Sequence, residues 1–315
     1  MTSSEIDSSR RAAWESLIHR SLDEWGSQFH DRRLEKEFIE SFTSLEDFLG
    51  QPPEIPMFWF FQRRDAFLSQ QTMTKWSRDR LADYVLLPAT PGYVTRTQCF
   101  FLSHFWHSPT HPDPEGQNLR LCQAELGVQS WSYIWVDWSC IPQSPRDEVE
   151  DKYFTRGLQT MAGIIRNSGF MWYYPATFQP RLWILWETAE YLLTHADGYE
   201  VTEDNRPFVE HIREMLRGGG VLPILEKYGY FCTYARDREF LTAWLDALVL
   251  FKTVGLPTDD IRRLQDQITW FPSVQVMIMN SVRGPIRLER YEGTLIVGGR
   301  SYTFKPFPSW VGTPI

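Results

Sequence analysis

Two short apolar runs separated by a segment of helix length constrain the fold of this chain most. The first run covers residues 99–106 (Cys-Phe-Phe-Leu-Ser-His-Phe-Trp), and the second covers residues 133–143 (Tyr-Ile-Trp-Val-Asp-Trp-Ser-Cys-Ile-Pro-Gln). Strands buried in a parallel sheet are typically short, apolar throughout and connected by a helix. We therefore predict a β-α-β unit, with strands at 99–105 and 132–137 and a helix from roughly 115 to 126.

The segments on either side of this unit follow helical or alternating patterns. Helices are predicted at 11–30, 31–48, 57–70, 72–85, 181–194, 206–217, 222–230, 236–252 and 258–268. One more helix is predicted from an acidic start near residue 147 through 155–166. Strands are predicted at 170–174, 274–279, 285–289 and 294–304. This pattern indicates an α/β fold with a parallel sheet core, flanking helices and a small C-terminal β-hairpin region. The predicted segments are an N-terminal helical cap (1–94), the α/β core (95–197), a helical extension (198–272) and the hairpin region (273–315).

Composition limits the class of protein and its partners. The formal net charge of −8 and the absence of a Lys/Arg stripe argue against a nucleic-acid partner held by general electrostatics. The four cysteines form no CxxC pair and no regular spacing, so we expect reduced thiols in a cytoplasmic protein without a secretory signal. No apolar run approaches the roughly 20 residues that a membrane span needs, so no membrane partner is expected.

Polar side chains follow the two predicted core strands at the point where each strand ends. Ser103 and His104 close the first strand, and Asp137 and Ser139 close the second. Ligands of open α/β sheets gather at the carboxyl ends of the strands, so we predict the binding pocket there, with His104 lining it. Asp137 either orients a substrate hydroxyl or caps the next turn.

A third group of candidate residues lies on the predicted helix at 181–194. Trp183 and Glu187 are one helical turn apart on one face, and the residues between and around them are apolar. A carboxylate in apolar surroundings is costly unless it has hydrogen-bond partners or a chemical task. The alternative is an ordinary helix glutamate that faces solvent or pairs with Arg181.

Residues at the strand ends also raise the possibilities of a metal site and of a cysteine nucleophile. His104, His107 and His111 have the spacing H-x2-H-x3-H with Asp113 next, but they cross a strand end and a proline-containing loop, so we predict no metal site. Cys140 is a possible nucleophile with His104 as its base, for instance in acyl transfer. A lone cysteine after a strand is more often a small buried apolar residue.

Three motifs taken together resemble the fungal heterokaryon-incompatibility (HET) domain family. They are residues 102–106 (Leu-Ser-His-Phe-Trp), residues 133–143 and residues 181–187 (Arg-Leu-Trp-Ile-Leu-Trp-Glu), which match in order an LSY-x-WG strand, a WID-x-x-CI-x-Q strand and an R-x-W-x-x-x-E helix. The family is related to TIR domains, so the resemblance implies a flavodoxin-like, TIR/HET-like core. The chain departs from the family pattern at His104, where the family has Tyr, and at His107, where it has Gly.

The resemblance also implies an activity. Several TIR domains cleave NAD with a glutamate on a W-x-x-x-E helix, and Glu187 is the matching position. The implied function is that of an NAD-type nucleotide glycohydrolase or a related N-ribosyl transferase, with NAD as substrate and no separate cofactor. The residues expected to serve it are Glu187, Asp137 and His104 in catalysis, Ser103 at the phosphates, and Phe105, Trp106, Trp138, Trp183 and Arg181 around the nucleotide.

Two other functions remain open on the sequence. One is a non-catalytic incompatibility or cell-death signalling module that acts by self-association. The other is an enzyme of fungal specialised metabolism that uses the same pocket for a different small molecule.

Overall fold

The structure is a computed structural model that divides into two compact units, Met1–Tyr173 and Tyr174–Ile315. It describes residues 3–26, 33–52, 56–108, 110–195 and 199–309, with side chains from residue 8 onward. The predicted boundary at 197/198 therefore lies outside the described residues, and the division into four segments stays a prediction. Within the described residues, no helix has the length and apolar character that a membrane crossing requires.

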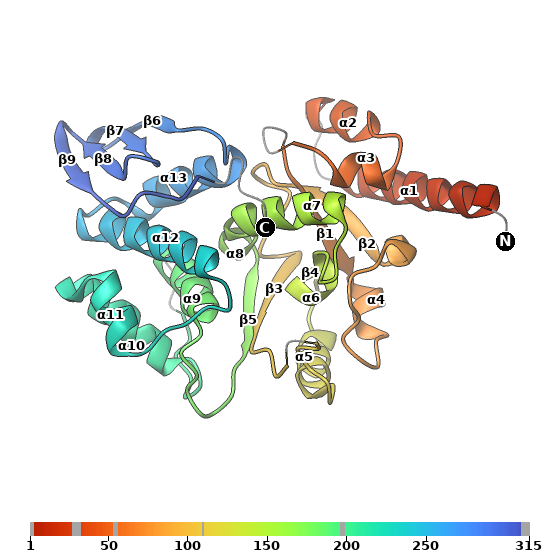
Figure 1. Ribbon diagram of the computed structural model, residues 1–315, viewed down its shortest axis with the longest axis horizontal. Coiled ribbons are helices and arrows are strands. Elements are labelled where there is room, and N and C mark those ends of the chain that lie inside the picture. The colour runs from red at the N-terminus through yellow and green to blue at the C-terminus, as the bar shows by residue number, and fades with distance from the viewer. Residues whose placement is uncertain (1–2, 27–32, 53–55, 109, 196–198, 310–315) are drawn as a thin grey trace. The chain divides into compact units, whose positions relative to one another are not determined.

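The first unit is built on a mixed five-stranded sheet with the strand order β2-β1-β4-β3-β5. Strands β3 (Cys99–His104), β4 (Tyr133–Trp135) and β5 (Gly169–Tyr173) run parallel, with β3 in the middle of the three. The predicted strand–helix–strand unit and the third strand are thereby confirmed. Strands β1 (Phe58–Arg63) and β2 (Tyr84–Pro88) extend the sheet in antiparallel fashion beyond β4 (Figure 1).

The helices predicted at 57–70 and 72–85 are wrong over most of their length. Residues 58–61 and 84–87 are continuous apolar runs, and every one of these side chains is buried because both faces of the sheet are covered. Helical structure is confined to α4 (Arg64–Leu68) and to the 3-10 helix η1 (Arg78–Asp83). A short apolar run fits a buried helix as well as a buried strand, and here pairing between the two runs decides the outcome.

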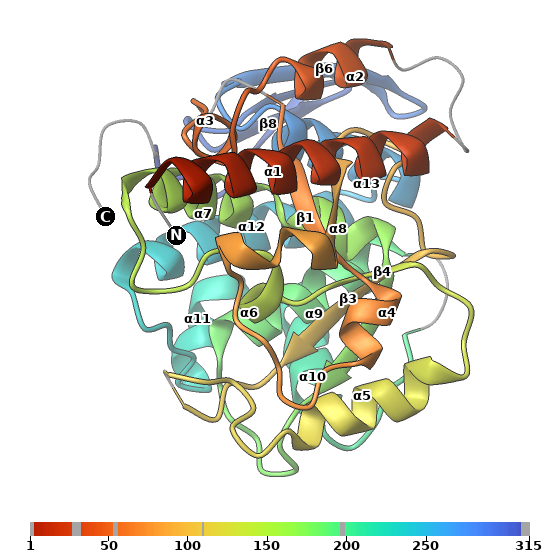
Figure 2. The ribbon, with the colours of Figure 1, turned by 90° about the vertical axis from the view of Figure 1, so that its right-hand side faces the viewer.

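Helices complete the first unit. They are α1 (Ser3–Gly26), α2 (Arg33–Glu40), α3 (Leu45–Leu49), α5 (Gln117–Gly127), α6 (Asp137–Cys140), α7 (Glu148–Thr160) and α8 (Ala162–Asn167). The helix predicted over 31–48, whose first two residues lie outside the described part, is two helices, because Ser44 caps α3. Helix α1 lies across the β1–β2 end of the sheet (Figure 2), where the Trp25 indole donates to the Leu86 carbonyl.

The second unit combines helices with a four-stranded antiparallel sheet. Its elements are α9 (Leu182–Thr194), α10 (Arg206–Glu214), the π-helical turn η2 (Met215–Gly219), α11 (Val221–Lys227), α12 (Ala235–Thr253), α13 (Thr258–Trp270), β6 (Val276–Ser281), β7 (Gly284–Glu289), β8 (Thr294–Val297) and β9 (Arg300–Thr303). The strands pair in chain order, and 298–299 form the predicted turn between β8 and β9, which confirms the C-terminal β region. Trp186, Trp244 and Phe251 lie in the core of this unit.

Candidate functional site

The carboxylate of Asp137 lies at the centre of the candidate site in the first unit. Its Oδ1 is 2.9 Å from His104 Nε2 and 2.6 Å from the backbone N of Trp138, and its Oδ2 is 2.9 Å from Trp106 Nε1. The indole and backbone N–H groups can only donate, so both carboxylate oxygens act as acceptors. The Asp137 side chain is 35% exposed, whereas that of His104 is 1% exposed, so the carboxylate is fixed on its protein side and open on the other.

The carboxyl ends of β3 and β4 bring these residues together. His104 is the last residue of β3, and Asp137 begins α6 directly after the extended residue Val136. The predicted second strand therefore ends earlier than 137. Gln143 closes the turn, because its side-chain amide donates to the carbonyls of Asp137 (2.8 Å) and Ile141 (3.2 Å).

Two indole rings form an aromatic wall beside the carboxylate. The Trp106 and Trp138 rings meet edge to face with centroids 5.4 Å apart. Trp138 is buried and donates to the carbonyl of Met73, while Trp106 is half-buried. The ammonium group of Lys75 lies 5.7 Å from the Trp138 ring centroid, so one ring of the wall is already in contact with a cation.

The imidazole of His104 has two different environments. Asp137 accepts from Nε2, which fixes the proton of the neutral ring there, and this leaves Nδ1 as a lone-pair acceptor. Nδ1 is buried and has no hydrogen-bond partner within the described residues. A buried polar atom without a partner is costly, so Nδ1 is an acceptor that a donor could satisfy.

The other two residues predicted at this edge are placed differently. Ser103 is buried in β3, where it lies in register with Trp172 of β5. Phe105 is half-buried, and its ring contacts the ring of His107 with centroids 5.7 Å apart. Their predicted contacts with a nucleotide stay predictions.

The histidine-rich loop after β3 is held together by its own hydrogen bonds. His111 Nδ1 accepts from the backbone N–H of Asp113 (3.1 Å), and His111 Nε2 donates to the carbonyl of Met73 (3.1 Å). The Asp113 carboxylate accepts from the backbone N–H of Leu119 in α5 (2.9 Å), and His107 is exposed. Across the described ranges, no three His, Cys, Asp or Glu side chains are grouped as a metal ion would need.

Burial works against Cys140 as a nucleophile. The Cys140 side chain is buried, and burial raises the pKa of its thiol to about 12. A thiol is reactive as the thiolate, so near neutral pH this group is a weak nucleophile. The four cysteines are all free thiols.

The candidate residues of the predicted late helix belong to the second unit. The guanidinium of Arg181 lies 5.0 Å from the Phe231 ring centroid, and the indole of Trp183 donates to the Asp237 carboxylate (3.1 Å). Glu187 is a half-buried residue of α9. Its predicted convergence with the strand ends of the first unit stays a prediction.

A carboxylate that the sequence analysis missed lies three residues further along α9. Glu190 is fully buried, and its Oε2 accepts from Trp244 Nε1 at 2.6 Å. Trp186 and Glu190 repeat the W-x-x-x-E spacing three residues further along the chain, so the spacing marks Glu190 as a candidate but does not tell which of the two acids is buried. Glu190 is therefore the acid of this helix that most needs a hydrogen-bond partner, and Trp244 provides one.

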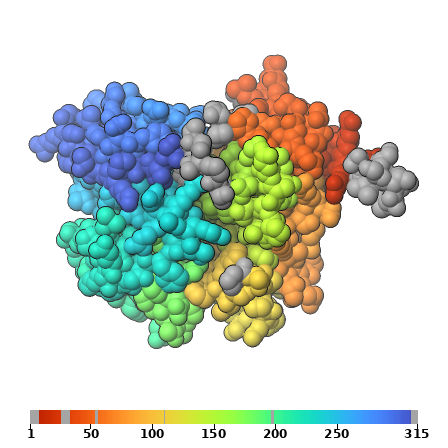
Figure 3. Space-filling model, viewed as in Figure 1, coloured from red at the N-terminus to blue at the C-terminus, as the bar shows by residue number. Residues whose placement is uncertain are grey.

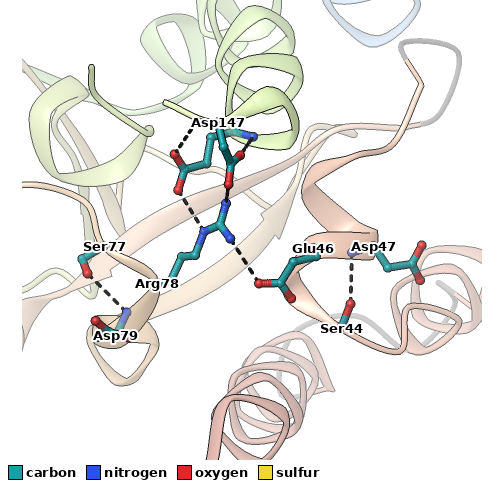
Figure 4. Close-up of polar contacts among 8 residues, drawn as sticks. Ser44, Glu46, Asp47, Ser77, Arg78, Asp79 and Asp147 are labelled. Atoms are coloured by element: carbon teal, nitrogen blue, oxygen red, sulfur yellow. Dashed lines mark hydrogen bonds and ion pairs between the residues drawn. The ribbon is translucent and has the colours of Figure 1, made fainter. Parts of the chain in front are cut away.

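The acidic start of α7 holds an arginine rather than a ligand (Figure 4). The Arg78 guanidinium is bonded to Glu150 (2.9 Å), to Glu46 (3.3 Å) and to Asp147. Burial lowers the pKa of Arg78, but the Glu150 and Asp147 carboxylates outweigh burial and raise it. A hollow of about 390 Å³ beside Arg78 also contains Lys75, whose ammonium donates to the Ser144 carbonyl (2.6 Å), so both cations are already used by the protein.

Comparison with known proteins assigns no family or function to the chain. No family model matches the chain. Curated proteins gave no match, and neither did solved structures.

Proposed function

We propose that the chain is an NAD-type nucleotide glycohydrolase, or a related N-ribosyl transferase, with a flavodoxin-like, TIR/HET-like core. The observation that carries the proposal is the Asp137 carboxylate, held by His104, Trp106 and the Trp138 backbone at the carboxyl ends of parallel strands and open on one side. The three ordered motifs that resemble the HET family support the same class of activity.

The main requirement of this reaction is a negative charge placed beside the ribose. Nicotinamide is bound to the ribose as a cation and leaves as a neutral molecule, so its departure needs no general acid. The ribose develops oxocarbenium character, which a carboxylate stabilises, while ribose hydroxyls donate to carboxylate oxygens. Water, or the acceptor hydroxyl in a transferase, then adds to the anomeric carbon and loses a proton to solvent. In this proposal the open edge of Asp137 accepts from the ribose hydroxyls, because its other lone pairs are taken by protein N–H groups.

Glu187 is the second carboxylate of the proposal. It occupies the family's W-x-x-x-E position, and α9 holds it half-buried. We assign to it the stabilisation of the ribosyl cation. Ser103 is assigned to the phosphates, and Trp106 and Trp138 to the base.

The test is release of nicotinamide from NAD, measured by liquid chromatography with the full chain. We expect release by the native protein and a loss of at least about 100-fold in the Asp137→Asn and Glu187→Gln variants, since removal of one electrostatic group commonly costs that much. Glu115→Gln, which neutralises an exposed carboxylate at the start of α5, is the matched control and should keep full activity. Circular dichroism confirms that each variant is folded.

Full activity in both carboxylate variants refutes the assignment of these residues. Absence of nicotinamide release by the native protein refutes the glycohydrolase itself. If that protein instead forms oligomers that grow with concentration in sedimentation experiments, the signalling module by self-association takes its place.

One observation favours a second candidate, an enzyme that acts on another small molecule in the same pocket. His104 has a carboxylate on Nε2 and, within the described residues, no partner on Nδ1, which is the arrangement of a general base. A His104→Gln variant separates the two, because the glutamine amide can still donate to Asp137 but has no imidazole lone pair. Glycosidic cleavage, in which His104 only positions Asp137, is then largely retained, whereas proton-transfer chemistry is abolished. We further propose a cytoplasmic location, in keeping with four free thiols.

A further inference from the structure

A second hollow lies wholly within the second unit, between α10 and α11. Its volume is about 420 Å³, and six of its lining residues carry the argument: His211, Arg213, Glu214, Arg217, Lys227 and Tyr228. Figure 3 shows the segment that contains α11, in green-blue, at the surface of the molecule. None of these residues belongs to the site built on Asp137.

His211 forms the floor of this hollow and is fixed on three sides. Its Nδ1 lies 2.8 Å from the hydroxyl of Tyr230, and its ring stacks on Tyr228 with centroids 3.5 Å apart and planes at 21°. Phe178 packs edge-on against the ring, with centroids 5.5 Å apart. The residue is only 7% exposed, so the stacked ring has a single orientation.

The proton of His211 is on Nε2, the nitrogen that has no partner among the described residues. Burial lowers the pKa of His211, so the imidazole is neutral near pH 7. Tyr230 is buried and its hydroxyl has no other acceptor within the described residues, so it donates to Nδ1. The proton of the neutral ring then lies on Nε2, for which the described residues offer no acceptor.

The acidic residue beside His211 is already neutralised. The Glu214 carboxylate accepts from Lys227 Nζ (2.7 Å) and from the Tyr228 hydroxyl (2.8 Å). These two donors lower the pKa of Glu214, Lys227 first. Glu214 therefore positions the cation and the phenol at the rim instead of repelling an anion.

Two arginines complete the lining of the hollow, and their positive charges are not paired with any carboxylate of the described residues. Arg213 and Arg217 are exposed and four residues apart, and neither has an ion-pair partner in the part of the chain that the structure describes. Three cations and two carboxylates, Glu210 and Glu214, leave the lining net positive, in a chain whose formal net charge is −8.

We infer that the α10–α11 hollow binds the phosphate group of a small phosphomonoester. Arginine forks match phosphate oxygens in pairs, and a neutral imidazole N–H adds a directed donor from the buried side. A hollow of about 420 Å³ leaves space beside a phosphate for the rest of a small molecule. The inference is independent of the glycohydrolase proposal, because it uses no residue of that site.

The experiment titrates inorganic phosphate into the full chain at constant ionic strength, with chloride as the replaced anion. Binding is followed by calorimetry and by the imidazole resonances of His211 in ¹⁵N–¹H spectra. We expect saturable binding that shifts the His211 Nε2 resonance. We expect at least a tenfold loss of affinity in the double variant Arg213→Ala, Arg217→Ala, whose substitutions lie on an exposed surface and leave the fold intact.

The matched control removes two positive charges elsewhere in the second unit. Arg283 and Arg300 are both exposed, and the Arg283→Ala, Arg300→Ala double variant should bind phosphate as tightly as the native chain. Equal weakening in both double variants, equal binding of phosphate and chloride, or an unchanged His211 resonance would each overturn the site.

Discussion

The hydrogen bond between the Trp106 indole and the Asp137 carboxylate can be measured on its own. Substituting Trp106→Phe keeps an aromatic ring and deletes the N–H that lies 2.9 Å from Oδ2. Substituting Asp137→Ala deletes the acceptor. Combining both substitutions in a double-mutant cycle isolates the coupling between them, because the other contacts of each residue cancel.

The structure fixes the expected size of this coupling. A hydrogen bond to a charged group contributes about 1.5–3 kcal/mol when its partner is removed in a buried site. The Asp137 side chain is 35% exposed, so water replaces part of the lost interaction and the value falls toward about 1 kcal/mol. A coupling of that size corresponds to roughly a fivefold change in the folding equilibrium.

Urea unfolding of the four proteins, followed by near-ultraviolet circular dichroism at pH 7, measures the coupling free energy. The Trp25→Phe substitution, which removes the indole donor to the Leu86 carbonyl, is the control and should show no coupling to Asp137→Ala. A coupling within about 0.3 kcal/mol of zero for Trp106 and Asp137 would refute the geometry on which the candidate site rests.

Three further predictions concern stability. Trp244→Phe removes the N–H donor to the buried Glu190 carboxylate and should lower the free energy of unfolding by about 2–3 kcal/mol in urea titrations; a change below 1 kcal/mol would contradict the bond. Although burial raises the pKa of Asp147, the backbone N–H of Glu150 and the Arg78 guanidinium outweigh it and hold that pKa below 3.8. Its stabilisation is therefore full above pH 3.8 and lost as pH falls through the lowered value, so the difference in urea midpoint between native and Asp147→Asn proteins should vanish at the acid end. Gly293→Ala, at φ +63° and against the Phe304 carbonyl oxygen, should increase amide exchange in β8 and β9; unchanged exchange would refute the clash.

The sheet core could be predicted because its strands are bounded by polar residues. The runs that became β3, β4 and β5 end at His104, Asp137 and Tyr174, where a polar side chain or a turn breaks the apolar pattern. Residues 58–61 and 84–87 are bounded in the same way, by Gln62 and by Asp83 and Pro88. A short apolar run with such bounds also fits a buried helix, and only their mutual pairing, which is a long-range property, makes them strands.

The location of the candidate site in the fold was predictable from the sequence, but the orientation of its side chains was not. Parallel strands bring their carboxyl ends together, so the proximity of His104 and Asp137 follows from topology. Side-chain rotation decides that the Trp106 indole turns toward Asp137 and that Glu190 is buried against Trp244, and spacing along the chain does not contain that information.

The antiparallel pairing of β1 has a consequence for the order of events on the ribosome. Strands β1 and β2 are synthesised close together and can pair early. The other edge of β1, at Arg63, can pair only after Tyr133 of β4 has been synthesised. Until then the edge of β1 at Gln62 and Arg63, next to the apolar run at 58–61, is unpaired and can template aggregation. We therefore expect factors that shield this edge during translation to raise the yield of folded chain.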